Sequence, residues 1–266
     1  MHARSGAAFW ALVLIAIGAI FLLQNLNILS GNVWGTIWPV FLILLGGWLL
    51  LGNFTRRSSG ATTVQPIPLD GARQAHLAVH QGAGRLNLGP SSDPATLVSN
   101  TVDSDLEQTV RREGDRLDVT LRQERDWTFW MWPWNWGSGL HWTMNVNREV
   151  PLSLDLHTGA SQANIDLRDL KVNSLKLDIG ASTVDLTLPA IGHVTGRIKA
   201  GAATVRIRVP DGVAARIRAS LGAATLNVRG TRFPWQGGMY QSPDYDTAAN
   251  RVDLDIDAGA STIDVT

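Results

Sequence analysis

The sequence predicts a membrane-anchored all-β protein, in which a two-helix transmembrane hairpin is followed by a β-solenoid of 21-residue repeats. Two observations predict this fold class. Two long uncharged apolar runs lie near the amino terminus, and a strand pattern centred on Gly-Ala recurs through the rest of the chain. The predicted domains are the hairpin at 1–54, a linker at 55–75 and the solenoid at 76–266, with insertions at 91–152 and 229–252.

The apolar runs at Ala7–Leu23 and Val33–Leu51 are predicted to span the membrane. A helix needs about 20 apolar residues to cross the hydrocarbon core, and both runs approach that length. Two buried helices of a soluble core are a poor alternative, because helices this long normally keep a polar face. A cleaved signal peptide also fits poorly, since the first run exceeds a signal h-region and no small-residue cleavage site follows it.

The charges that flank the two runs predict the orientation of the hairpin. Arg4 precedes the first run, Arg56 and Arg57 follow the second, and the loop between the runs is uncharged. Basic residues beside transmembrane segments favour the cytoplasmic side. We therefore expect a cell-membrane protein with two spans, whose solenoid lies in the cytoplasm.

Six copies of one pattern make up the predicted solenoid, each reading as strand, small-residue corner, strand and turn. The strands alternate polar and apolar residues with a period of two, so each strand buries one face. One copy cannot bury its own apolar face, so the copies must stack. The copies begin at His76, Ser153, Ser174, Thr195, Arg216 and Asp253. Their seventh position is always glycine, at Gly82, Gly159, Gly180, Gly201, Gly222 and Gly259.

The Gly-Ala corners are predicted to be structural. Glycine in a strand pattern typically marks a bulge or a bend that needs a positive φ, and an alanine after it, as at Ala160, Ala181, Ala202, Ala223 and Ala260, leaves room for close packing. A phosphate-binding glycine loop is the alternative. No glycine-rich stretch here leads into a helix or supplies a following lysine, so this alternative is disfavoured.

Charged residues one period apart support stacking in sequence order. The expected opposite-charge pairs are Asp155 with Lys176, Asp178 with Lys199 and Asp185 with Arg206. Such neighbours on adjacent strands contribute roughly 0.2–1 kcal/mol each. The same order also places Arg197 beside Arg218, which is a like-charged pair.

A tryptophan-rich stretch, DWTFWMWPWNWGSGLHW, lies at Asp126–Trp142 within the first insertion. Three interpretations remain open: a cap over the end of the solenoid, docking at the membrane interface where tryptophan is enriched, and a platform for carbohydrate or lipid. Capping is favoured over docking only because every solenoid must cover its ends. The candidate cap, membrane or partner contacts are Trp127, Trp130, Trp132, Trp134, Trp136 and Trp142.

The composition and the motifs argue against several classes of function. The chain has no cysteine, which excludes disulfides and thiolate chemistry, and its 23 basic and 23 acidic residues cancel, so nothing indicates nucleic acid. His80 and His157 share a column that Asp178 continues, which makes a two-histidine, one-carboxylate site conceivable, but the insertion between the first two copies leaves their adjacency open. We expect no metal, no cofactor and no enzymatic activity, since no Ser/His/Asp grouping has a recognisable spacing.

Two regions resemble known bacterial proteins. The NLNIL loop and the IWPVFLILLGGWLLL span resemble the transmembrane region of LiaI/LiaF-type envelope proteins, and VPLSLDLHTGASQANIDLRDLKVNSLKLDIGASTVDLTLP resembles toast-rack β domains, of the LiaF C-terminal-like kind. The resemblance implies a membrane protein of the cell-envelope stress response, where LiaF-like members restrain a sensor histidine kinase.

The expected partners are therefore the lipid bilayer and a membrane sensor kinase or another envelope protein. The alternative function is a membrane-bound structural scaffold that self-associates by polymerising through the solenoid ends, where unpaired strand edges are available.

Overall fold

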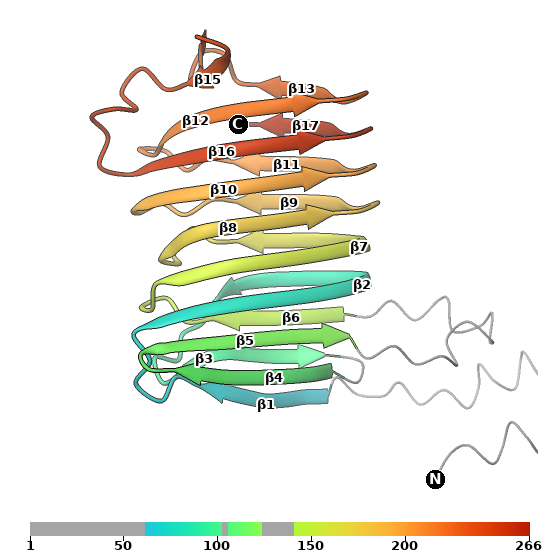
Figure 1. Ribbon diagram of the computed structural model, residues 1–266, viewed down its shortest axis with the longest axis vertical. Helices are drawn as coiled ribbons and strands as arrows, with labels where there is room; N and C mark the ends of the chain where they lie inside the picture. The colour runs from blue at the N-terminus through green and yellow to red at the C-terminus, as the bar shows by residue number, and fades with distance from the viewer. Residues whose placement is uncertain (1–61, 103–105, 124–140) are drawn as a thin grey trace, which may run out of the picture. The chain divides into compact units, whose positions relative to one another are not determined.

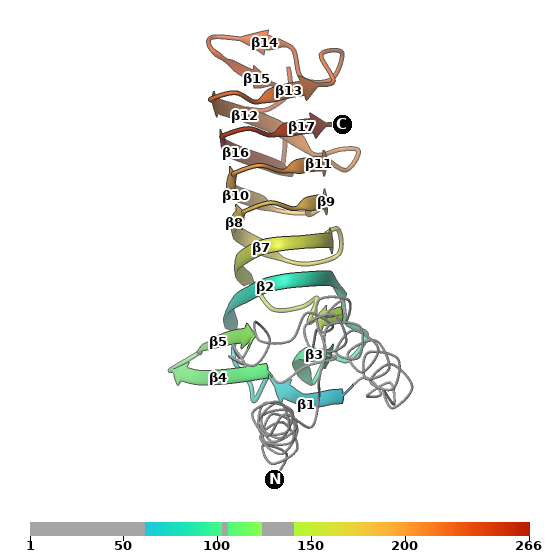
Figure 2. The ribbon, with the colours of Figure 1, turned by 90° about the vertical axis from the view of Figure 1, so that its right-hand side faces the viewer.

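The computed structural model describes residues 62–102, 106–123 and 141–266. These residues form an all-β stack of coils, in which each coil has one strand on either side of the stack (Figures 1 and 2). This part of the chain contains no helix long and apolar enough to cross a membrane. The two apolar runs that predict the transmembrane hairpin lie outside the described residues.

The two sides of the stack are ladders of mostly parallel strands. The first side contains, in spatial order, β4 (Leu106–Glu113), β5 (Arg116–Gln123), the first half of β2 (Gln74–Pro90), the first half of β7 (Leu152–Asp166), β8 (Val172–Ile179), β10 (His193–Ala200), β16 (Arg251–Ala258) and β12 (Ala214–Leu221). The second side contains β1 (Thr62–Pro68), β3 (Thr96–Val102), β6 (His141–Val146), the second halves of β2 and β7, β9 (Thr183–Thr187), β11 (Thr204–Arg208), β17 (Thr262–Val265) and β13 (Thr225–Val228). A short hairpin of β14 (Trp235–Gln236) and β15 (Met239–Gln241) pairs with the start of β12.

The inward side chains of both ladders meet in one continuous hydrophobic core. In β10, exposed and buried residues alternate along the whole strand. Its inner residues Val194 and Ile198 are at most 1% exposed. The period-two pattern therefore predicts correctly which face of this strand is buried.

The last copy of the repeat does not lie where the sequence order places it. Strand β16 pairs in register with β10 on one edge and with β12 on the other, and β17 lies in the same way between β11 and β13 (Figure 1). We call β16 and β17 the acidic coil, because Asp253, Asp255, Asp257 and Asp264 point outward from it.

The expectation that Arg197 and Arg218 are neighbours is therefore wrong. Asp255 lies between them, opposite Arg197 on β10 and opposite Arg218 on β12. The physical reason is electrostatic, since the inserted carboxylate replaces a repulsive pair by two attractive ones. The other pairs expected from the period are confirmed: Asp155 with Lys176, Asp178 with Lys199 and Asp185 with Arg206.

Residues 62–68, which composition assigns to the linker at 55–75, form strand β1 at the first end of the stack. This strand pairs with β3, and its Ile67 is 1% exposed in the core. The first insertion also contributes to this end, because β5 and β6 pair in parallel with the two halves of β2. Strands β5 and β6 thus form a further coil, which has no Gly-Ala corner.

Candidate interaction surfaces

The corner glycines stack directly on one another along the solenoid. A Cβ atom added to Gly159 would lie 2.2 Å from the carbonyl oxygen of Gly82, and one added to Gly180 would lie 2.7 Å from that of Gly159. Neither glycine has a positive φ. The expectation of a positive φ at these corners is wrong, because close approach of the next coil is what requires glycine.

Buried serines bind the backbone of neighbouring corners. Ser182 Oγ donates a hydrogen bond of 2.9 Å to the carbonyl of Gly159 and accepts one of 3.0 Å from the amide of Ser161. Ser261 Oγ does the same for Gly201 and Ala203, at 2.9 and 3.1 Å. The serine of each Gly-Ala-Ser corner is therefore structural, as the glycine is.

A shallow groove of about 770 Å³ runs along the outside of the corners. Alanine, serine, threonine and glutamine side chains line most of it. Arg85 stands at one end, where its guanidinium donates to Gln162 Oε1 at 3.2 Å and lies 3.3 Å from His141 Nε2. The groove follows from the small residues that the stacked corners require, so packing accounts for its shape.

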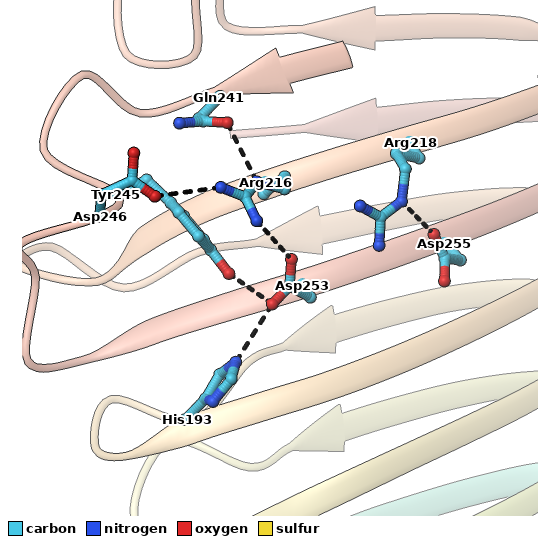
Figure 3. A network of polar contacts seen from close by, with 8 residues as sticks. All are labelled: His193, Arg216, Arg218, Gln241, Tyr245, Asp246, Asp253 and Asp255. Carbon is cyan, nitrogen blue, oxygen red and sulfur yellow. Dashed lines mark hydrogen bonds and ion pairs between the residues drawn. The ribbon is translucent and has the colours of Figure 1, made fainter.

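The most connected polar cluster of the described surface surrounds Asp253 of the acidic coil (Figure 3). The carboxylate accepts a hydrogen bond from Tyr245 and contacts His193 Nε2 at 3.1 Å and Arg216 Nη1 at 3.8 Å. The Arg216 guanidinium also lies 4.0 Å from the ring centroid of Tyr245. These contacts join β10, β12, β16 and the second insertion. The cluster therefore helps to hold β16 between β10 and β12.

The electrostatics of this cluster favour a charged carboxylate beside a neutral phenol. Partial burial raises the pKa of Asp253, but the hydrogen bonds from Tyr245 and His193 and the charge of Arg216 outweigh burial and lower that pKa below its usual value. Burial and the hydrogen bond to Asp253 raise the pKa of Tyr245 to about 12. The cluster therefore pairs an ionised Asp253 carboxylate with the cation of Arg216 and the neutral phenol of Tyr245.

Comparison with known sequences identifies two regions of the chain. Residues 56–208, more than half of the sequence, match the family described as the N-terminal domain of toast_rack, DUF2154. The chain belongs to the toast-rack family. Residues 8–50 match the LiaI-LiaF-like transmembrane region. Both resemblances expected from the sequence are confirmed, and the protein is membrane-associated. No curated protein matches the chain.

Two solved structures are similar to this chain at low sequence identity. A candidate cell adhesion protein from Clostridium sporogenes ATCC 15579 has a TM-score of 0.60 at 18% identity, covering 77% of this chain and 98% of that chain. A candidate adhesin from Bacteroides fragilis NCTC 9343 has a TM-score of 0.32 at 9% identity, covering 78% of this chain and 99% of that chain. The first likeness supports the all-β solenoid fold.

Two histidines meet on the outer face of the toast-rack domain. His80 and His157 are opposite in the ladder, and their rings stack with centroids 4.5 Å apart. The adjacency that the sequence leaves open is therefore present, with Asp178 Oδ2 3.1 Å from His157 Nδ1. Burial and the charges of His157 and Arg122 lower the pKa of His80. Within the described ranges, no group of three His, Asp or Glu residues is placed to hold a metal ion.

The described part of the toast-rack domain contains one of the tryptophan candidates. Trp142 lies in β6 and is 0% exposed, packed in the core of the coil formed by β5 and β6. The candidates Trp127, Trp130, Trp132, Trp134 and Trp136 lie outside the described residues. Capping, membrane docking and a ligand platform remain predictions for them.

The Tyr245 phenol gives the toast-rack domain a testable alkaline transition. A group whose pKa is raised on folding stabilises the fold below its unfolded value, and this stabilisation disappears as the pH rises through the folded value. For Tyr245 the two values are 10.0 and about 12. We expect the free energy of unfolding to fall as the pH rises between these two values, and the fall to be smaller in Tyr245→Phe. Urea denaturation at a series of pH values measures the free energy of unfolding for both proteins.

Tyr240→Phe is the control, because Tyr240 is the other tyrosine of the chain and its ring packs edge-on against that of Trp235, with the ring centroids 4.7 Å apart. This variant should keep the alkaline fall of the wild type. An equal fall in Tyr245→Phe and the wild type would assign the transition to another group.

Proposed function

We propose that this protein is a non-enzymatic, membrane-anchored regulator or sensor in bacterial cell-envelope stress signalling, which acts through protein contacts. The observation that carries the proposal is the presence of a LiaI-LiaF-like transmembrane region at 8–50 and a toast-rack domain at 56–208 in one chain. A sensor histidine kinase of the membrane is the proposed partner, because LiaF-like proteins restrain kinases of this class. The proposed topology has two spans and a cytoplasmic solenoid.

The described surface supports contact with a macromolecule better than chemistry on a small substrate. Small-molecule sites are usually concave, mostly apolar and able to enclose most of the ligand. The groove over the corners is instead shallow and lined mostly by alanine, serine and threonine. The Asp253 carboxylate faces Tyr245, His193 and Arg216, so its charge is already compensated within the chain.

Deletion of the gene in its own host tests the proposal. We expect the transcriptional response to a cell-wall antibiotic to change, either in its basal level or in its amplitude, and the full chain to restore it. A version that lacks residues 1–54 should fail to restore the response although it accumulates, because signalling requires the membrane anchor. A response that is unchanged by the deletion would overturn the proposal.

A scaffold that polymerises through the solenoid ends is the second candidate function. The observation that favours it is the outer edge of β13, which pairs with no other strand of the described chain besides β17. Sedimentation of the fragment from Thr55 to Thr266 distinguishes the two candidates. A fragment that stays monomeric at high concentration excludes the scaffold.

A further inference from the structure

The end of the stack opposite β1 is only partly covered. The hairpin strand β15 pairs with β12 at Arg216 and Ile217 alone. Beyond these residues the outer edge of β12, from Arg218 to Leu221, has no neighbouring strand in the described chain, and β13 pairs only with β17 (Figures 1 and 2). We call this surface, formed by residues 218–221 and 225–228, the open edge.

The open edge presents backbone groups that can extend the ladder. The amides of Thr225 and Arg229 donate to the carbonyls of Ser261 and Val265, so they point toward β17. Successive amides of a strand point to opposite edges, and the amides of Leu226 and Val228 therefore point outward. Unpaired groups in a row of this kind are a template for an added strand.

The core is also incomplete at the open edge. In β11, which lies two coils below β13, Val205 and Ile207 are 0% and 1% exposed. The equivalent residues of β13, Leu226 and Val228, are only partly buried. Leu221 is 41% exposed, although most apolar residues in inward positions are buried. A strand with apolar side chains at alternate positions would cover these residues, as β16 and β17 cover the coil beneath them.

The charge of the open edge specifies what such a strand carries on its outer face. Elsewhere in the stack the acidic coil lies between two basic coils, and Arg218 Nε donates to Asp255 at 2.7 Å from above. A guanidinium has five N–H donors, so Arg218 retains donors for a second carboxylate. Arg229 is exposed beside the end of β13. Acidic and basic strands alternate in this part of the stack, so a strand that pairs with the free edge of β12 is expected to be acidic.

We propose that the open edge binds an extended, acidic segment of a partner protein by strand addition, with apolar side chains inward and carboxylates facing Arg218 and Arg229. This inference rests on the proposed function, since it names the surface through which the protein contacts its partner. At the opposite end, the outermost strand of the first side, β4, is less suited to this role. It is exposed and carries Glu107, Arg111, Arg112 and Glu113, and charges of this kind discourage strand pairing.

Peptide binding to the full-length protein in lipid nanodiscs tests the proposal. The probe is a fluorescent peptide with the sequence RVDLDIDAGASTIDVT, which is the acidic coil itself. We expect saturable binding by fluorescence anisotropy, and about tenfold or greater weakening when every Asp of the peptide is replaced by Asn. Absence of saturable binding by the wild-type protein would overturn the proposal.

Variants of the open edge show whether the peptide binds there. Val228→Pro removes an outward amide, and Leu221→Gln changes an exposed side chain without touching the β17 ladder. Both should weaken binding about tenfold or more, since each removes part of the edge. Ile191→Gln is the matched control, because Ile191 is 69% exposed and lies outside the open edge. Undiminished binding by both edge variants would contradict the proposal.

Two further outcomes separate this inference from its alternatives. Concentration-dependent dimers of the wild type that Val228→Pro abolishes would identify a second copy as the occupant and overturn the partner assignment. A Leu221→Gln chain that fully restores the antibiotic response of a deletion strain would reject the open edge while leaving the proposed function intact. Peptide binding in a protein whose deletion changes no response would reject only the proposed function.

Discussion

Gly159→Ala is expected to lower the free energy of unfolding by about 1–3 kcal/mol, the range typical of overpacking in a tight core. The added Cβ would lie 2.2 Å from the carbonyl oxygen of Gly82. This oxygen belongs to the backbone of β2 and cannot rotate away as the end of a side chain can. The two coils must therefore move apart, which weakens the ladder between β2 and β7. Urea unfolding of the variant and the wild type measures the loss.

Gly89→Ala is the matched control, because its Cβ would meet nothing within 4 Å and its φ is not positive. It should change stability by much less than Gly159→Ala. The other corners predict a graded series, since the closest approach is 2.7 Å at Gly180 and 3.3 Å at Gly222. Equal effects at Gly89, Gly159 and Gly222 would show that coil stacking is not the cause.

The corners illustrate which parts of the fold a single sequence predicts. The 21-residue period locates the corner glycines of the four consecutive copies, and the shared strand pattern locates those of the two outlying copies. The alternation of apolar residues identifies the inward face of the strands. The sequence does not show why glycine is required at the corners, because a positive φ and a close approach of another backbone both favour glycine. Only the stacked positions of Gly82 and Gly159 distinguish the two causes.

The order of the coils is harder to predict than their shape. All copies share one register, so any copy can pair with any other, and the hydrophobic pattern is equally satisfied by each order. Charge is the feature that distinguishes them. The like-charged pair of Arg197 and Arg218 was the available signal that sequence order fails, and the alternating carboxylates of the last copy were the signal for what replaces it.

The candidate surfaces also differ in how far the sequence predicts them. The tryptophan-rich stretch at Asp126–Trp142 is conspicuous in the sequence, but of its tryptophans only Trp142 lies among the described residues, and it is a core residue. The open edge has no sequence signature, because Leu221, Leu226 and Val228 match the buried pattern of the other copies. These residues are exposed because β12 and β13 form the end of the stack. They do so only because the acidic coil lies between them and the coil of β10 and β11.

Leu254→Ala is expected to lower the free energy of unfolding by about 2–5 kcal/mol, as for other fully buried leucines. Leu254 is 0% exposed and lies at the centre of β16. It faces Gly196 of β10, and a Cβ added to Gly196 would lie 2.6 Å from Leu254 Cδ2. Gly196→Ala alone should therefore also be destabilising, through contact with a residue distant in sequence.

A double-mutant cycle of these two changes tests the spatial order of the coils. Leu254→Ala removes the atom that the new Cβ meets, so Gly196→Ala should cost less in that background, with a coupling of about 1–2 kcal/mol. Stacking in sequence order would instead set Gly196 against Ile217, because β12 would pair directly with β10. In the structure Ile217 faces Leu254 and is separated from Gly196 by the acidic coil. Ile217→Ala and Gly196→Ala should then be additive within about 0.5 kcal/mol. Coupling to Ile217 without coupling to Leu254 would restore the sequence order and remove the basis for the acidic coil.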